Sequence, residues 1–382
     1  MFSTLHIVTA TVFASWALLT VLPTPTGWLW KPAVAATEWG HWLTLFSLFS
    51  AFFDYILELG WLPLSLHLAG AVLFASPTLR AVRVARALPL KLREAFGDPT
   101  RRPLPQSARS VPLVVSDLLH IPLPRVDQTR HVYHEVDGCQ LTLDLYRSSP
   151  PGRCPATVIV VHGGAWSSGD NTQLRGLNRY LAGRGYAVAA INYRLAPKHR
   201  FPAALEDVMT SIEFMTQRAV RFGTDPNRIV LLGRSSGGHL ALLAGYRSSL
   251  PSIRGVVALY PPTDMRWSWD RPAPRRLMDS NGAIVNFLGG SPSEVPDAFD
   301  RASPIDFVSP NSPPTLLLHG GSDELVSPLQ SHRLSERLLA DGVPSLHVEL
   351  PWAHHGMDAN LAGPSGQITT FAIEHFLSAV TG

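Results

Sequence analysis

A serine set among glycines is the residue best suited to covalent chemistry in this chain. The segment Gly233-Arg234-Ser235-Ser236-Gly237-Gly238 follows an apolar run at 228–232 and opens an Ala- and Leu-rich stretch at 238–247. A serine on a sharp strand-to-helix turn projects its hydroxyl outward, and flanking glycines leave the backbone room to bend. The spacing therefore predicts Ser235 as the nucleophile of an acyl transfer.

Two glycines after another apolar run could stabilise the charge that such a reaction creates. His162-Gly163-Gly164-Ala165-Trp166 comes directly after residues 157–161. Backbone N–H groups exposed at such a turn can donate hydrogen bonds to the negative oxygen of a tetrahedral intermediate. We expect Gly163, Gly164 and the N–H of Ser236 to form this oxyanion hole, with Trp166 as a candidate wall of the substrate pocket.

With these motifs the chain resembles the hormone-sensitive-lipase-like esterases of the α/β-hydrolase superfamily. Residues 192–197 and 201–207 are also similar to a segment of that family, and the resemblance runs from about Val132 to the C-terminus. It implies an esterase that forms a serine acyl-enzyme and needs no cofactor and no metal. The family often has a third glycine where Ala165 stands, and Asp and Ala where Arg234 and Ser236 stand. The arginine leaves the substrate preference open.

A serine nucleophile needs a base and a carboxylate that orients the base. In the α/β-hydrolase fold the acid and the histidine follow the serine in that order. Asp323 comes just after the apolar run 315–319, and His355 precedes a glycine after the run 346–350. Both positions match the family pattern, so we predict Asp323 as the acid and His355 as the base. Their neighbours Glu324 and His354 are the alternatives.

The elements that must position these residues alternate between strand and helix. A hairpin at 131–146 precedes apolar runs at 157–161, 187–192, 228–232, 255–260, 315–319 and 346–350, and the segments 171–183, 203–221, 238–247 and 328–341 between them are typical of helices. Such alternation indicates an α/β domain. We expect an α/β-hydrolase fold over 130–382, with a mostly parallel sheet of about eight strands and helices on both faces.

The candidate lid is a long insertion at 263–311, together with the residues before the hairpin. Loops at the carboxyl ends of parallel strands build the site in such sheets. Trp267 and Trp269 lie in this insertion and are, with Trp166, the predicted pocket residues. Arg194, Glu206 and Asp207 lie in the family-like segment, and we interpret them as a structural ion-pair cluster.

The first 97 residues have a different composition. Apolar stretches at 5–22, 42–59 and 61–75 precede a basic cluster from Arg80 to Arg109. Such stretches indicate transmembrane helices, and Lys and Arg gather on the cytoplasmic flank of a span. We therefore expect a membrane-associated helical region at 1–97, a Pro- and Arg-rich linker at 98–129, membrane lipids as partners and a cytoplasmic catalytic domain.

Composition excludes several other functions. The formal net charge is only +3, which argues against nucleic acid as a partner, and the two cysteines lack the spacing of a zinc site. The sequence thus predicts a serine carboxylesterase or lipase-like hydrolase acting on small-molecule or lipid esters. An amidase or arylformamidase with the same triad remains an alternative, as does a non-catalytic, membrane-tethered binding module.

Overall fold

The catalytic half is built on one eight-stranded sheet. The computed structural model describes residues 2–97, 109–148, 156–248 and 250–382. The strands are β1 (Val126–Val136), β2 (Cys139–Ser148), β3 (Thr157–Val161), β4 (Ala187–Ile191), β5 (Ile229–Arg234), β6 (Ile253–Leu259), β7 (Thr315–Gly320) and β8 (Ser345–Leu350), and their spatial order is β1-β2-β4-β3-β5-β6-β7-β8. Pairings from β4 to β8 are parallel, while β1–β2 and β2–β4 are antiparallel. The predicted fold class is confirmed.

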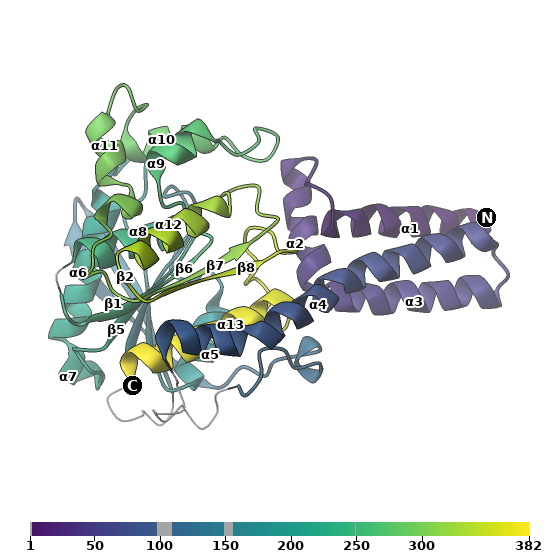
Figure 1. Cartoon of the computed structure of the whole chain (residues 1–382), viewed down its shortest axis with the longest axis horizontal. Helices are drawn as coiled ribbons and strands as arrows, with labels where there is room; N and C mark the ends of the chain where they lie inside the picture. Colours follow the sequence, from purple (N-terminus) through teal and green to yellow (C-terminus); the bar gives the residue numbers. More distant parts are fainter. Residues whose placement is uncertain (1, 98–108, 149–155, 249) are drawn as a thin grey trace.

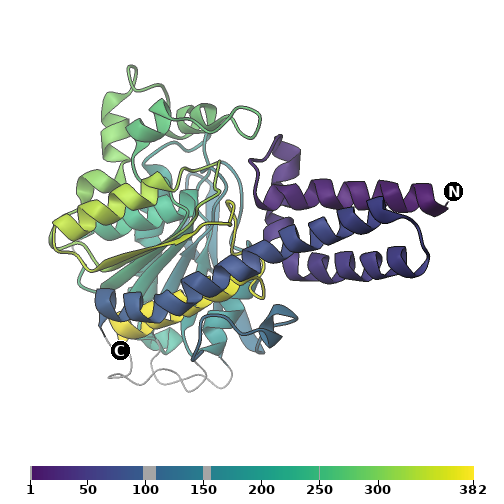
Figure 2. The same ribbon diagram turned by 45° about the vertical axis from the view of Figure 1, so that its right-hand side comes forward.

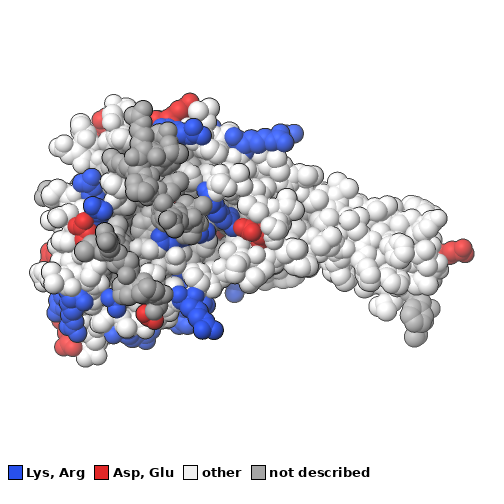
Figure 3. Space-filling view, turned by 90° about the horizontal axis from the view of Figure 1, so that it is seen from below, with Lys and Arg blue, Asp and Glu red and all other residues white. Residues whose placement is uncertain are grey.

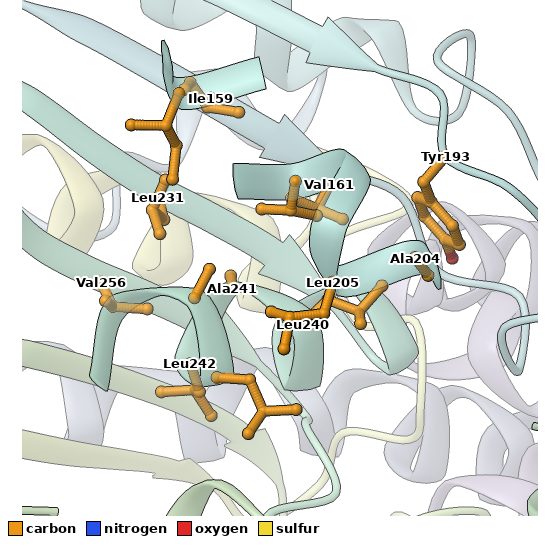
Figure 4. Close-up of a cluster of buried hydrophobic side chains, with 14 of the residues drawn as sticks. Ile159, Val161, Tyr193, Ala204, Leu205, Leu231, Leu240, Ala241, Leu242 and Val256 are labelled. Atoms are coloured by element: carbon orange, nitrogen blue, oxygen red, sulfur yellow. The ribbon is translucent and has the colours of Figure 1, made fainter. Parts of the chain in front are cut away.

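Helices cover both faces of this sheet (Figure 1). One face carries α6 (Ala203–Gln217), α8 (Ser236–Arg247) and α12 (Leu329–Ala340), with the short α7 (Ala219–Phe222) at the end of α6. The other carries α5 (Arg175–Gly183), α13 (Pro364–Thr381) and part of α4 (Trp61–Phe96). Figure 4 shows Leu240 and Leu242 of α8 packed near Leu231 of β5. Strands covered on both faces become continuous apolar runs, which is why β3 and β4 are buried throughout.

The N-terminal helices form a projection from the catalytic domain. These are α1 (Phe2–Ala17), α2 (Trp30–Glu38), α3 (Gly40–Ile56) and α4. Figures 1 and 2 show α1, α3 and the first part of α4 running side by side away from the sheet, and we call these three segments the stalk. By length and composition, one described helix, α4, could cross a membrane.

The α4 helix is much longer than the predicted span at 61–75. It continues to Phe96, so the basic residues between Arg80 and Arg93 lie on the same helix as the apolar stretch. Its second part packs through Ala81, Leu88 and Leu92 onto the sheet side of the catalytic domain. Leu, Ala and Arg all favour helix, which explains why the change in polarity does not end it. A single helix thus joins the stalk to the catalytic domain.

On the face that Figure 3 shows, the stalk carries almost no Lys, Arg, Asp or Glu. Its exposed side chains include Val8, Val12, Phe46, Phe49, Phe52, Ile56, Leu68 and Val72. The acid that interrupts the second apolar stretch, Asp54, is buried inside the stalk, 2.9 Å from His6 Nδ1 and 2.6 Å from His67 Nδ1. Pairing with two imidazoles satisfies this carboxylate away from water.

Part of the predicted linker at 98–129 packs against the catalytic domain. Residues 98–108 lie outside the described part of the chain. From Arg109 onward the chain packs on α13, since the Arg109 N–H donates to Glu374 (3.0 Å) and the Val114 N–H to Gln367 (2.8 Å). The first strand begins at Val126, before the expected domain boundary at 130. Helix α13 is not among the helices predicted from the sequence. This helix is covered by both the sheet and α4, so its sequence lacks the polar face that marks an amphipathic helix.

Candidate active site

Ser235 occupies a strained turn between β5 and α8. Its backbone angles are φ 52° and ψ −121°, a conformation that residues other than glycine adopt only where the surroundings enforce it. A Cβ at Gly233 would lie 2.2 Å from the carbonyl oxygen of Gly237, and one at Gly237 would lie 2.2 Å from that of Val161. Both glycines are therefore required by close backbone contact, and the turn holds the serine at the strand end.

Three predicted residues meet at this turn. His355, in the loop after β8, has Nε2 3.0 Å from Ser235 Oγ and Nδ1 2.6 Å from Asp323 Oδ2. Asp323 lies in the loop after β7. The sheet order places β5, β6, β7 and β8 side by side, so their carboxyl ends bring the serine, acid and imidazole together. The arrangement can pass a proton from the hydroxyl to the imidazole.

Asp323 is held as a carboxylate. Its Oδ1 accepts hydrogen bonds from the N–H groups of Leu325 (2.9 Å) and Val326 (3.0 Å). Burial raises its pKa, but the charge of His355 and hydrogen bonds from His319 and His355 outweigh burial and hold the pKa below its ordinary value. The carboxylate can therefore keep the imidazole oriented with Nε2 free to accept the serine proton.

The oxyanion donors differ in part from the prediction. The N–H of Gly163 already donates to Gln173 Oε1 at 2.8 Å. Within the described residues, no acceptor engages the N–H groups of Gly164 or Ala165. Ser236 is the first residue of α8, where N–H groups have no intrahelical partner. Of the three residues predicted to form the oxyanion hole, Gly164 and Ser236 thus have N–H groups with no competing acceptor. The N–H of Ala165, next to Gly164, is likewise available.

Arg234 is buried and neutralised. Its Nε bonds Asp358 Oδ2, and Tyr260 donates its hydroxyl to the other oxygen of Asp358 at 2.6 Å. The sequence pattern offered no signal for Asp358, because the two partners are 124 positions apart. Since the guanidinium is paired, the cation beside Ser235 is a structural support of the turn as well as part of the pocket lining.

The alternative acid and base lie beside the relay without joining it. Glu324 Oε2 accepts the N–H of Thr24 at 2.6 Å, and its other oxygen bonds Arg276. His354 lies between two carbonyl oxygens, with Nε2 3.2 Å from that of Leu19 and Nδ1 3.1 Å from that of Ser322. Both residues hold the N-terminal segment against the catalytic loops.

A pocket of about 680 Å³ opens at the serine. That volume suits a small-molecule ligand. Among the predicted wall residues, Trp166 and Trp267 line the pocket, whereas Trp269 packs edge-on against Phe299 with ring centroids 5.8 Å apart and does not. Trp166 stacks on Phe287 at 4.4 Å and donates its indole N–H to His239 Nδ1. The walls are mostly aromatic and aliphatic.

The predicted lid insertion forms the outer wall. It contains α9 (Met265–Asp270), α10 (Ser280–Leu288) and α11 (Pro296–Arg301), and it supplies Trp267, Met278 and Ile284 to the pocket. Trp30, Val34 and Trp39 of the N-terminal segment supply another wall, which sequence patterns did not predict. Among the described residues, no group of His, Cys, Asp or Glu could hold a metal ion.

Arg194 lies outside this pocket, as predicted for a structural cluster. Its guanidinium bonds Asp207 (2.9 Å), Asp137 (2.8 Å) and Glu206 (3.3 Å). These bonds tie the segment after β4 to the start of α6 and to the β1–β2 turn.

Comparison with known proteins agrees with this geometry. The BD-FAE family model matches residues 143–338. Esterase LipC of Mycobacterium tuberculosis is 36% identical over 272 residues, covering 66% of this chain but only 65% of LipC, and esterase LipQ of the same organism is 29% identical over 322 residues, covering 79% and 76%. The solved bacterial heroin esterase superposes with a TM-score of 0.61 at 22% identity, covering 70% of this chain and 88% of its own. The resemblance seen in the motifs is confirmed, and the chain belongs to the BD-FAE family within the α/β-hydrolase superfamily.

Proposed function

We propose that this chain is a serine carboxylic ester hydrolase with Ser235 as nucleophile, His355 as base and Asp323 as acid. The observation that carries the proposal is the continuous hydrogen-bonded relay from Asp323 through His355 to Ser235 Oγ, at 2.6 and 3.0 Å. The relatives named above are esterases, which favours ester over amide or formamide substrates. A binding module would not need this relay.

In the acylation step, Ser235 Oγ attacks the ester carbonyl carbon while His355 Nε2 takes the hydroxyl proton. Asp323 stabilises the imidazolium through Nδ1–H. The N–H groups of Gly164 and Ser236, with that of Ala165 beside them, donate to the oxyanion of the tetrahedral intermediate. When the intermediate collapses, the bond to the alcohol breaks and His355 gives its proton to the departing alcohol oxygen.

In the deacylation step, water takes the place of the alcohol. His355 Nε2 removes a proton from the water as it attacks the acyl carbon of the ester formed on Ser235. The second tetrahedral intermediate collapses, the carboxylic acid leaves and the serine hydroxyl regains its proton from the imidazole. Atoms balance with one water consumed for each ester cleaved, and no cofactor or metal is needed.

The stalk supports membrane attachment. Helices α1 and α3 have 16 and 17 residues, which at 1.5 Å per residue span about 25 Å, close to the hydrocarbon thickness of about 30 Å. Its large exposed side chains are apolar, and its buried acid is paired with histidines. A surface of this kind is stable in lipid and a liability in water. We therefore assign the stalk to the bilayer and lipophilic esters to the pocket.

The basic residues on α4 favour a cytoplasmic catalytic domain. Arg80, Arg83 and Arg86 follow the apolar part of this helix, and such residues flank spans on the cytoplasmic side. A reporter protein fused after Gly382 should respond only to cytoplasmic substrates in intact cells. A reporter that responds only to external substrates would reverse the orientation.

The proposed activity is tested with the purified full chain and p-nitrophenyl butyrate. We expect the wild type to hydrolyse this ester and Ser235→Ala to show no activity above background. Ser293→Ala is the control and should keep the wild-type activity, because Ser293 is exposed and is far along the chain from Ser235. Equal turnover by the wild type and Ser235→Ala would reject the serine mechanism. If the folded wild type hydrolyses formamides but not esters, the substrates are formamides and the proposed ester class is wrong.

A further inference from the structure

Helix α2 lies between the active site and the stalk. It follows α1 in the chain and precedes α3, and Figures 1 and 2 show it beside the carboxyl ends of the strands, where the stalk begins. Trp30, Val34 and Trp39 of this segment line the same pocket as Ser235 and His355. The pocket thus has one wall made by the chain that enters and leaves the stalk.

Trp30 lies close to the reacting groups. The centroid of its indole is 6.5 Å from that of the His355 imidazole, and a Cβ at Gly356 would lie 3.5 Å from the indole. Trp28, two positions earlier, is 75% exposed and is not part of the pocket lining. The two tryptophans of one short segment therefore have opposite environments, one at the site and one in solvent.

Hydrogen bonds fix this wall to the catalytic domain at both ends. Before α2, the Arg276 side chain donates its Nε–H to the carbonyl oxygen of Thr24 (2.9 Å). The backbone carbonyl oxygen of Arg276 accepts a hydrogen bond from the N–H of Gly27 (2.8 Å). At the end of α2, the carbonyl of Glu38 accepts from Asn360 Nδ2 at 2.9 Å. A wall held at both ends is a permanent part of the pocket.

The lining chemistry indicates what this wall contacts. Trp30, Val34 and Trp39 present aromatic and aliphatic surface to a pocket that Met278 and Ile284 of the insertion also line, and Lys31 adds a charged amine to the same lining. Such surface gains binding free energy from each methylene that it removes from water. The wall adjoins the stalk, which places the pocket beside the part of the chain that we assign to the bilayer.

We propose that Trp30, Val34 and Trp39 are specificity-determining residues that select esters bearing a long apolar chain. This inference rests on the proposed ester hydrolysis. It makes the N-terminal segment part of the substrate site as well as an anchor. The substrate class is then a carboxylic ester whose apolar chain is long enough to pack along Trp30, Val34 and Trp39.

The test compares Trp30→Ala with Trp28→Ala in the full chain in detergent. Values of kcat/KM are measured for p-nitrophenyl esters from acetate to dodecanoate, in which the acyl chain grows, and for alkyl acetates, in which the alcohol grows. In one of the two series, Trp30→Ala should lose about tenfold or more on the longest chains and little on acetate, because each methylene that packs against this wall adds binding free energy and acetate offers the fewest. Trp28→Ala should match the wild type in both series.

The outcomes separate this inference from the proposed function. If the wild-type activity depends on Ser235, but kcat/KM of Trp30→Ala falls equally for all chain lengths or does not fall, only the specificity role is overturned. Activity that does not depend on Ser235 overturns both. If Trp30→Ala fails to fold, Trp39→Ala carries the same test, because this indole is 38% exposed and its removal disturbs packing less.

Discussion

His354 Nε2 lies 3.2 Å from the carbonyl oxygen of Leu19, across 335 positions of the chain. The base of the proposed triad is the next residue, so the loop that carries His355 is also the loop that holds the N-terminal segment. Glu324, next to Asp323, makes the matching contact with Thr24. The loops that carry Asp323 and His355 therefore both contact the N-terminal segment between α1 and α2.

Removal of His354 should weaken this docking. In His354→Ala the carbonyl oxygen of Leu19 or Ser322 that accepts the imidazole N–H loses its buried donor, which costs about 1–3 kcal/mol in the free energy of unfolding. Chemical denaturation of the purified protein measures the change. His332→Ala is the control, because its imidazole is on the surface, and it should stay within about 0.5 kcal/mol of the wild type. Equal stability of both variants would contradict the docking role.

The identity of the acid is tested by a pair of neighbouring variants. Asp323→Asn should lower kcat by roughly 10⁴-fold, because an amide at this position favours the wrong tautomer of His355. Glu324→Gln should keep most of the activity, since Glu324 bonds Thr24 and Arg276 instead of the imidazole. Steady-state hydrolysis of p-nitrophenyl butyrate distinguishes them. The reverse ranking would make Glu324 the acid.

The oxyanion turn depends on Gly164. Its φ is +129°, and a Cβ there would lie 2.1 Å from the carbonyl oxygen of Ser168, so Gly164→Ala must move the loop that carries the donor N–H. We expect kcat to fall by about 10²–10³-fold, as when an oxyanion donor is lost. Gly185→Ala is matched to it, because Gly185 has φ +94° and open space at the Cβ position. Similar kcat losses in both variants would point to strain alone.

The buried carboxyl of Glu38 makes stability depend on pH. Burial raises its pKa from 4.5 to about 8. Hydrogen bonds from Ser365 lower the pKa, and the nearby charge of Asp358 raises it further, but burial is the largest effect. The folded state thus holds a proton that the unfolded chain releases, so stability falls as pH rises from about 4.5 to 8. Thermal unfolding at pH 6 and pH 8 should show a smaller drop for Glu38→Gln than for the wild type.

The surface variant Glu336→Gln provides the comparison for Glu38. Its carboxylate is exposed at the end of a helix ion pair, and its replacement should leave the pH dependence of the wild type unchanged. A drop between pH 6 and pH 8 that is the same in all three proteins would mean that another group controls it.

Local patterns predicted most of the catalytic half. The strand, glycine turn and Ala-rich helix around Ser235 are contiguous in the chain. The run that precedes Asp323 is a buried strand, and the run that precedes His355 is a partly buried strand at the edge of the sheet. Because parallel strands end at one edge of the sheet, the order of these runs already implied that the three residues meet. The placement of the serine, acid and imidazole follows from this order.

Long-range contacts could not be predicted in this way. The pairing of Arg234 with Asp358 and the α2 wall both join side chains whose positions depend on the finished fold. The Gly163 N–H bonds the side chain of Gln173, ten positions along the chain, and no motif indicates this contact. The continuation of α4 past the apolar stretch and the doubly covered α13 also lack a local signal. The segment around Trp30 carries no motif, although Trp30, Val34 and Trp39 line the pocket.

The most direct test of the central claim is to locate the covalent intermediate. The full chain is mixed with p-nitrophenyl butyrate, quenched in acid within the first turnovers and digested for mass spectrometry. The mechanism predicts a butyryl group on the peptide that contains Ser235, and none on this peptide in Ser235→Ala. Butyrylation of another residue, or ester hydrolysis that persists in Ser235→Ala at the wild-type rate, would contradict the proposed serine hydrolase.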